Sequence, residues 1–231
     1  MYSPTLFLCW RDAPPELSRA DLAFVRERVA RVAGLRRALG FTPMQISADQ
    51  PYAADGRGPA FTLELTFDDA GALETAALGD LVADGALPSL AGAQPEAQAM
   101  WGRTFPVPDP VFRSAKPCTF LVEYPGECAE PTPWLDHYDS HHPKIMVRFP
   151  EVREVATFRP APELGLALPC EINRSMQRNK VVFDSGEALA RALASPILLE
   201  MRADSAGFAP VSRRPTHWPM ATHAFARAAL C

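Results

Sequence analysis

An internal repeat limits the architectures open to this chain. The segments Gly34–Pro43 and Glu151–Pro160 align without a gap, matching at an aliphatic residue, an arginine, a phenylalanine and a final proline. Each follows an earlier apolar, β-prone segment, Thr5–Trp10 in the first half and Cys118–Tyr124 in the second. Self-similarity of this kind predicts one supersecondary unit that is used twice.

Helical segments fall at matching places in the two copies. In the first copy, apolar residues recur with a helical period over residues 18–32, and Ser18 is placed to cap that helix. In each copy a third strand then runs directly into a second helix, which begins after Asp69 or Ser185. A last apolar segment completes each copy, so the predicted order of elements is βαββαβ, twice.

This order is that of the ferredoxin-like unit. One such unit has helices on a single face of its sheet, so the other face needs a cover, which a second copy supplies. We therefore predict an α+β fold in which two ferredoxin-like βαββαβ halves pack sheet to sheet as a pseudo-dimeric α+β barrel. The expected halves are residues 1–105 and 118–231, joined by the proline-rich linker 106–117.

The second copy contains a stripe that the first lacks. Trp134, Tyr138 and His142 stand at i, i+4 and i+8, so on a helix they share one face. Alignment backwards from the repeat places Val25 of the first copy opposite His142. We therefore expect the second half to carry the candidate site, while the first half is mainly scaffold.

Composition argues against several classes of protein. The chain has 231 residues and a net charge of −4, with no stripe of Lys and Arg, so we expect no nucleic-acid partner. No apolar run is long enough for a membrane span, and the N-terminal segment lacks the basic region of a secretory signal. Five scattered cysteines without a C-x-x-C pair favour reduced thiols and a cytoplasmic location.

Over roughly residues 118–225 the chain resembles the EthD-type members of the dimeric α+β barrel superfamily. In the first part of the resemblance, a set of residues stands at the distances from His142 that are typical of the family. They are Trp134, Tyr138, Ile145, Phe149, Pro150 and Val152. The segment Ala188–Pro196, followed by Asp204 and Phe208, is similar to the family's A-x-A-x-x-S-P … D-x-x-x-F ending. Relatives place a proline two residues after the histidine. Here Pro143 directly follows His142 and stands two residues after His141. His141 is therefore an alternative equivalent of the family's histidine.

The resemblance implies a site on the stripe. We expect His142 to act as general acid/base, because imidazole titrates near neutral pH, and Tyr138 to donate a hydrogen bond to the substrate. His141, Trp134 and Tyr124 are expected to bind the substrate. The structural alternatives are a polar helix end for the two histidines and ordinary core packing for the aromatic residues.

Three functions stay open. The first is a cofactor-independent acid/base enzyme of isomerase, cyclase or lyase type, acting on a small aromatic or lactone-like molecule. The second is a cofactorless oxidoreductase or monooxygenase acting on a phenol, and the third is a non-catalytic module for ligand binding or assembly. We expect no cofactor and no metal, although His217 and His223 together with His141 and His142 leave a metal or haem site as a further alternative. Assembly of two chains into a homodimer of pseudo-dimers also stays open.

Overall fold

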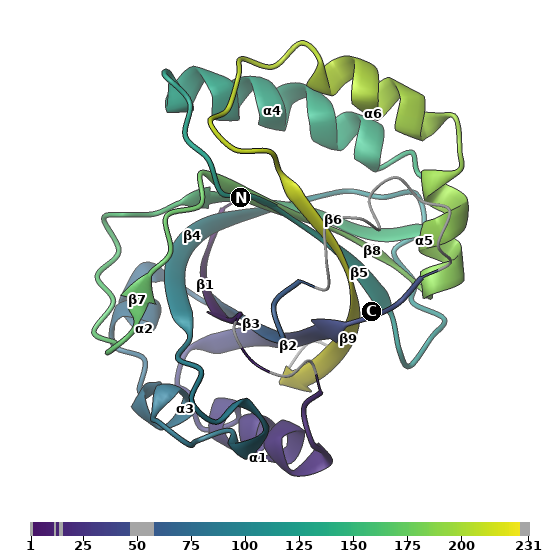
Figure 1. Ribbon diagram of the computed structural model, residues 1–231. Coiled ribbons are helices and arrows are strands. Elements are labelled where there is room, and N and C mark those ends of the chain that lie inside the picture. The colour runs from purple at the N-terminus through teal and green to yellow at the C-terminus, as the bar shows by residue number, and fades with distance from the viewer. Residues whose placement is uncertain (1, 12, 14–15, 47–57, 227–231) are drawn as a thin grey trace.

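Eight antiparallel strands form a closed barrel, which Figure 1 shows along its axis. The structure is a computed structural model that describes residues 2–11, 13, 16–46 and 58–226. The barrel strands are β1 (Ser3–Trp10), β2 (Leu35–Pro43), β3 (Phe61–Phe67), β4 (Glu96–Phe105), β5 (Cys118–Tyr124), β6 (Val152–Pro160), β8 (Gln177–Phe183) and β9 (Thr216–Ala226). The short strand β7 (Glu171–Ile172) runs parallel to β4. The predicted α+β class and its barrel are confirmed.

The strand order shows how the barrel closes. Within residues 1–105 the order is β4–β1–β3–β2, and within 118–231 it is β9–β5–β8–β6. The outer strands of the two groups then pair, β2 with β9 and β4 with β6. The two sheets therefore do not stack face to face as we expected. They join edge to edge, because pairing satisfies the backbone groups that each open edge would expose.

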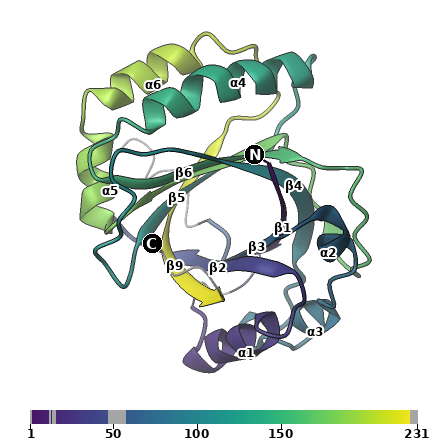
Figure 2. The same cartoon turned by 180° about the vertical axis from the view of Figure 1, so that it is seen from behind.

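Helices cover the outside of the barrel in two groups (Figures 1 and 2). Over the first-half strands lie α1 (Arg19–Val29), α2 (Ala70–Glu74), α3 (Gly79–Val82) and a 3-10 turn at Pro88–Leu90. Over the second-half strands lie α4 (Pro131–Met146), α5 (Gly186–Leu193) and α6 (Ile197–Ser205). The predicted caps are confirmed, since the side chains of Ser18, Asp69 and Ser185 each accept a hydrogen bond from a backbone N–H of the following helix.

The barrel interior contains buried ion pairs. The Lys180 ammonium on β8 lies 2.6 Å from a Glu64 oxygen and 3.1 Å from a Glu154 oxygen. Arg37 completes the group through a 2.6 Å contact with Glu154. These charges depend on one another, because a charge left alone in the interior would lose its hydration without gaining a partner.

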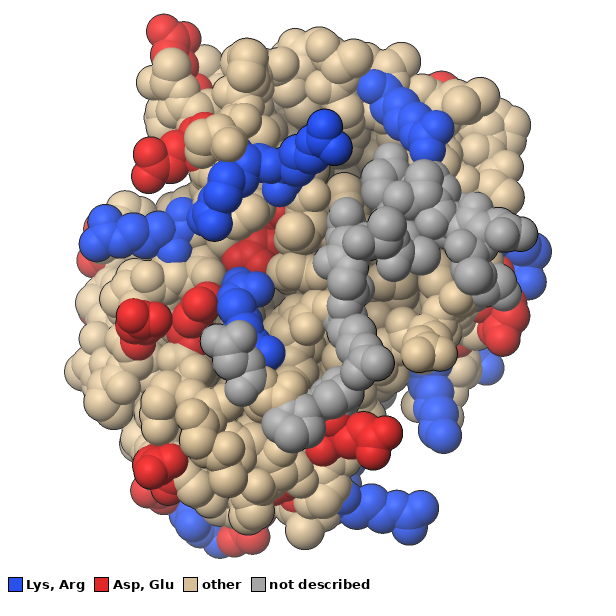
Figure 3. Space-filling model, in the orientation of Figure 1, with Lys and Arg blue, Asp and Glu red and all other residues tan. Residues whose placement is uncertain are grey.

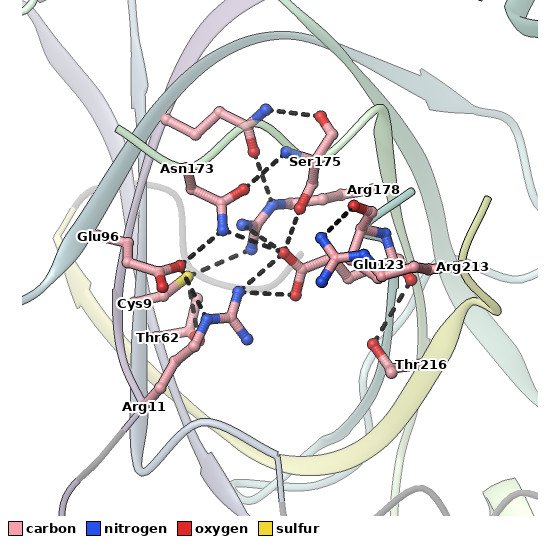
Figure 4. Close-up of polar contacts among 12 residues, drawn as sticks. Cys9, Arg11, Thr62, Glu96, Glu123, Asn173, Ser175, Arg178, Arg213 and Thr216 are labelled. Carbon is pink, nitrogen blue, oxygen red and sulfur yellow. Dashed lines mark hydrogen bonds and ion pairs between the residues drawn. The ribbon is translucent and has the colours of Figure 1, made fainter. Parts of the chain in front are cut away.

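A second ion-pair network lies at one end of the barrel (Figure 4). Glu123 accepts hydrogen bonds from Arg11 at 2.8 Å, from Arg178 at 3.1 Å and from the Ser175 hydroxyl. Arg178 also donates to the sulfur of Cys9 at 3.2 Å. On the face shown in Figure 3, acidic and basic side chains are interspersed around this end. The pair Glu123–Arg178 also links β5 to β8, on which these two residues are register partners.

The carboxylate of Glu123 ties stability to pH. Burial raises its pKa, but Arg178 and Arg11 outweigh burial and lower it to about 2. Since this value lies below the ordinary 4.5, the stabilisation is complete above pH 4.5 and is lost as the pH falls toward 2. We expect Glu123→Gln to reduce the free energy of unfolding at neutral pH and to flatten its fall over this range. Urea unfolding at several pH values measures both, and equal slopes in variant and parent would contradict the expectation.

The stretch 106–117 joins β4 to β5 without a helix or strand. Asp109 within it accepts a 2.9 Å contact from Arg153 of β6, which ties the connection to the barrel. In the part of the chain that the structure describes, no helix is both long and apolar enough to cross a membrane. Cys231 lies outside the described residues, and the other four cysteines form no disulfide.

Candidate functional site

A cavity of about 370 Å³ lies between helices α4 and α6 and the outer face of the barrel. Side chains of β5 and β8 form its floor. The lining is mainly aliphatic and aromatic, and its polar side chains are Tyr124, Tyr138, His142, Asn179, Arg202, Ser205 and His217. A concave, mostly apolar site with a few polar groups is typical of sites that bind small organic molecules.

The predicted stripe on α4 faces this cavity. Trp134, Tyr138 and His142 are all buried, with Tyr138 fully so. The Trp134 and Tyr138 rings stack with centroids 5.2 Å apart, and the Tyr138 and His142 centroids are 4.7 Å apart. Phe208 contacts all three rings at centroid distances between 5.3 and 5.5 Å. This packing restricts the orientation of the imidazole.

His142 forms a dyad with Asp204 of α6. Its Nδ1 lies 2.7 Å from Asp204 Oδ2. Because an ionised carboxylate only accepts hydrogen bonds, Nδ1 carries the hydrogen and Nε2 keeps a free lone pair. Burial lowers the pKa of His142, Asp204 partly offsets this, and His217 lowers it further. The neutral imidazole therefore prevails at neutral pH, as a general base requires.

Buried phenols and amides form the floor beneath the stripe. Asn179 Nδ2 donates to the Tyr138 hydroxyl at 2.7 Å, and the Tyr124 ring lies edge-on to Tyr138 with centroids 5.6 Å apart. Burial raises the pKa of Tyr138 well above its ordinary value, and Tyr124 adds to the shift. Tyr138 is therefore neutral at physiological pH, and this floor is polar but unfavourable to negative charge.

The structure brings four of the five predicted site residues together. Tyr124, Trp134, Tyr138 and His142 all line the cavity. His141 is instead exposed, stacks on the His137 ring with centroids 4.4 Å apart, and is not among the residues that line the cavity. Of the two adjacent histidines, geometry thus places His142 at the cavity. The His141 side chain points away from this cavity, because a 100° turn per residue separates the directions of adjacent side chains on a helix.

Two further cavity residues, Asn179 and His217, and the His142 partner Asp204 were not predicted as site residues. Asp204 belongs to the residues of the family resemblance, but it stands 62 positions from His142, so no local pattern connects the two residues. Asn179 offered one signal, since Gln177 and Asn179 place two amides on the strand face that also carries the apolar Val181. His217 was considered only as a metal ligand, and its ring stacks on Phe120 with centroids 5.6 Å apart.

No group of three or more His, Cys, Asp and Glu side chains within residues 2–11, 13, 16–46 and 58–226 is arranged to hold a metal ion. His223, another histidine of the metal alternative, contacts the Thr42 hydroxyl at 2.9 Å. In the first half, Val25 is fully buried in the apolar core beneath α1. The position opposite His142 in the repeat thus has a packing role.

The dyad predicts a pH profile with a defined direction. A reaction that uses His142 as base slows when the imidazole is protonated, and the lowered pKa places this acid limb below pH 6.5. Asp204→Asn removes a carboxylate that raises the pKa, so we expect the limb to move to lower pH. His217→Gln removes a group that lowers it, so the limb should move to higher pH. The measurement is kcat/KM against pH, and shifts of the same sign in both variants would contradict this account.

No family model matches the chain, and no curated protein matches it. Solved structures share its fold at low identity. A putative monooxygenase from Lactobacillus acidophilus aligns over 95% of this chain and 94% of its own, with a TM-score of 0.52 and 10% identity. One of the same description from Fusobacterium nucleatum aligns over 97% and 93%, with a TM-score of 0.55 and 6% identity.

A third similar structure is that of an anthrone oxidase-like protein. It covers 99% of this chain and 96% of its own length, with a TM-score of 0.60 and 12% identity. Similarity at these identities concerns the fold alone. It places the chain among closed α+β barrels, in agreement with the strand order described above.

Proposed function

We propose that this protein is a cofactor-independent acid/base enzyme that acts on a small aromatic or lactone-like molecule. The observation that supports this most is the His142–Asp204 dyad on the wall of an aromatic cavity. A buried, neutral imidazole whose Nδ1 is held by a carboxylate has the tautomer and orientation of a general base. The stacked rings of Trp134 and Tyr138 offer a flat apolar surface for a ring substrate.

In the proposed reaction, His142 Nε2 takes a proton from an acidic C–H or O–H bond of the substrate. Asp204 holds the Nδ1 hydrogen and stabilises the imidazolium that forms. The Tyr138 hydroxyl, at the floor one turn away, donates a hydrogen bond to a substrate oxygen. Return of the proton at another position gives an isomer, and loss of a leaving group or closure of a ring gives the lyase or cyclase outcome. No electrons leave the substrate.

We further infer that residues 1–105 and 118–231 are tandem ferredoxin-like units of EthD-like type. The support is the strand order, fourth–first–third–second in both units, and the position of the sequence repeat on β2 and β6. The stripe on α4 has no counterpart in the first unit, where Val25 is packed in the core. The second unit would carry the reaction and the first would close the barrel.

The same base supports a second candidate, a cofactorless oxygenase. Proteins of similar fold carry the names monooxygenase and anthrone oxidase-like. Deprotonation of an activated methylene by His142 gives an electron-rich carbanion that O₂ can oxidise. The methylene becomes a carbonyl, one oxygen atom enters the product and the other leaves as water, with all four electrons supplied by the methylene.

Anthrone in deuterated buffer distinguishes these candidates, because its methylene is both acidic and oxidisable. Under nitrogen, base catalysis is measured by NMR as enzyme-dependent exchange of the methylene hydrogens for deuterium. In air, oxygenation is measured as oxygen uptake above the uncatalysed rate. Exchange without uptake supports the acid/base enzyme, and uptake supports the oxygenase. Binding with neither reaction, across anthrone, phenols and aryl lactones, would contradict both and favour a ligand-binding module.

A further inference from the structure

One guanidinium lies on the wall of the cavity between α4, α6 and the barrel. Arg202 of α6 lines this cavity, and within the described part of the chain no Asp, Glu or Lys side chain lines it. The remaining polar side chains of the wall are two phenols, an amide, a hydroxyl and two imidazoles. A ligand in this cavity therefore meets a permanent cation but no carboxylate on its wall.

The helical spacing of α6 explains why Arg202 faces the cavity. Four residues of this helix line it, and they share one face because they stand at i, i+3, i+4 and i+7: Leu198, Met201, Arg202 and Ser205. A helix face that packs over a core is ordinarily apolar, so an arginine on this face departs from the pattern. Arg202 also lies in the last turn of α6, where a cation interacts favourably with the helix dipole. That interaction depends on the end of the helix, however, and not on the face that looks into the cavity.

Solvent exposure places Arg202 at the mouth of the cavity. Tyr138 and Asn179 at the floor are at most 1% exposed, whereas Arg202 and Ser205 are both exposed. The Ser205 hydroxyl donates to the Met201 carbonyl of its own helix at 2.9 Å, so its hydrogen is already used. Arg202 is therefore the charged donor that a ligand meets at the open end.

The two ends of the cavity favour different parts of a ligand. The floor is unfavourable to negative charge, since burial raises the pKa of Tyr138 well above its ordinary value. At the mouth, a guanidinium offers a planar fork of N–H donors that matches the two oxygens of a carboxylate. Asp204, the acidic residue nearest to Arg202 in the sequence of α6 beyond Glu200, does not line the cavity, and its Oδ2 contacts His142. A ligand with a ring at the floor and a carboxylate at the mouth satisfies both ends.

We propose that Arg202 binds a carboxylate at the mouth of this cavity, which makes aromatic and lactone acids the substrate class. The substrate class rests on the proposed function, whereas the carboxylate site is itself a claim about binding. Arg202 determines specificity and orientation and takes no part in proton transfer. With the carboxylate held at the mouth, the attached ring extends inward toward the stacked rings of Trp134 and Tyr138.

A pair of ligands matched in shape tests the carboxylate site, 2-naphthoate and 2-naphthamide, which differ in charge. Titration calorimetry with the full chain at neutral pH and low salt measures both affinities. We expect about fivefold tighter binding of 2-naphthoate, the value of an ion pair at a partly exposed site. Arg202→Gln should abolish this preference and leave the affinity for 2-naphthamide nearly unchanged. Arg202→Lys should keep part of it, because the charge remains while the planar fork is lost.

Arg191→Gln is the matched control, because it makes the same change of charge on a neighbouring helix. Arg191 of α5 is exposed, pairs with Glu151 and does not line the cavity, so this variant should keep the preference of the parent. Added salt should weaken the preference in the parent and have little effect in Arg202→Gln, since it screens an exposed ion pair.

Because Arg202 is exposed, its substitution should leave the melting temperature close to that of the parent. Equal binding of the two ligands by the parent, no binding of either, or an unchanged preference in Arg202→Gln would overturn the carboxylate site. His142→Gln should keep the preference, because the base does not hold the carboxylate. A preference for 2-naphthoate that depends on Arg202, in a parent that catalyses neither exchange nor oxygen uptake, would therefore overturn the proposed function and not the carboxylate site.

Discussion

Replacing His142 with glutamine is expected to lower the rate of methylene exchange on anthrone about 10²- to 10⁴-fold. Glutamine keeps the approximate size and polarity of the side chain but does not accept a proton near neutral pH. The loss corresponds to roughly 3–5 kcal/mol of transition-state stabilisation. The dyad explains why the effect should be large, since Asp204 holds the one ring nitrogen at 2.7 Å and leaves the other free to act as base.

The adjacent histidine supplies a matched control for this substitution. His141 stands on the same helix but is exposed and stacked on His137, so His141→Gln is expected to leave the exchange rate unchanged. Circular dichroism and thermal unfolding establish that both variants keep the fold. Full activity in His142→Gln would show that His142 is not the base. Equal losses in both variants would indicate damage to α4 instead of loss of a catalytic group.

Replacing Lys180 with methionine is expected to reduce the free energy of unfolding by about 3–5 kcal/mol. Lys180 and Glu64 are almost fully buried, and the ammonium contacts both oxygens of Glu64 at 2.6 and 2.8 Å. Without the ammonium, Glu64 keeps a buried charge that lacks this partner, whereas Glu154 still contacts Arg37. Urea unfolding at neutral pH measures the loss.

Two comparisons identify the cause of that loss. Lys144→Met removes an exposed lysine from α4 and is expected to change stability by less than about 0.5 kcal/mol. Lys180→Met combined with Glu64→Leu should recover much of the lost stability, because no unpaired carboxylate is then left in the barrel. If the double variant is no more stable than Lys180→Met alone, the loss comes from packing and not from an unpaired charge.

The features that sequence predicted best are those with local causes. The α4 stripe follows from helical geometry alone, and Trp134, Tyr138 and His142 lie on one buried face as expected. The helix caps at Ser18, Asp69 and Ser185 are likewise confirmed, because a cap joins a side chain to backbone groups two or three residues away.

Features that depend on distant contacts were not predicted. All four side chains of the polar run Gln177–Lys180 are buried, which no local pattern predicted. The partners of Arg178, Asn179 and Lys180 include Glu123 of β5, Tyr138 of α4 and Glu64 of β3, and Glu64 stands 116 positions from Lys180. The edge pairings of β2 with β9 and of β4 with β6 also join segments that are distant in sequence. The barrel was therefore expected, but the edge pairing that closes it was not.

The sequence by itself therefore determined the order of the eight barrel strands, the helices α1, α2, α4 and α5, the caps and the helix face that carries His142, whereas β7, α3 and α6 were not predicted. Hydrogen bonds and side-chain periodicity within a few residues account for all of these. Only the tertiary structure decided how the barrel closes, which charges meet inside it, and that His142 joins Asp204 while His141 faces solvent. Such pairings depend on the approach of segments far apart in the chain, and no local pattern records which segments approach.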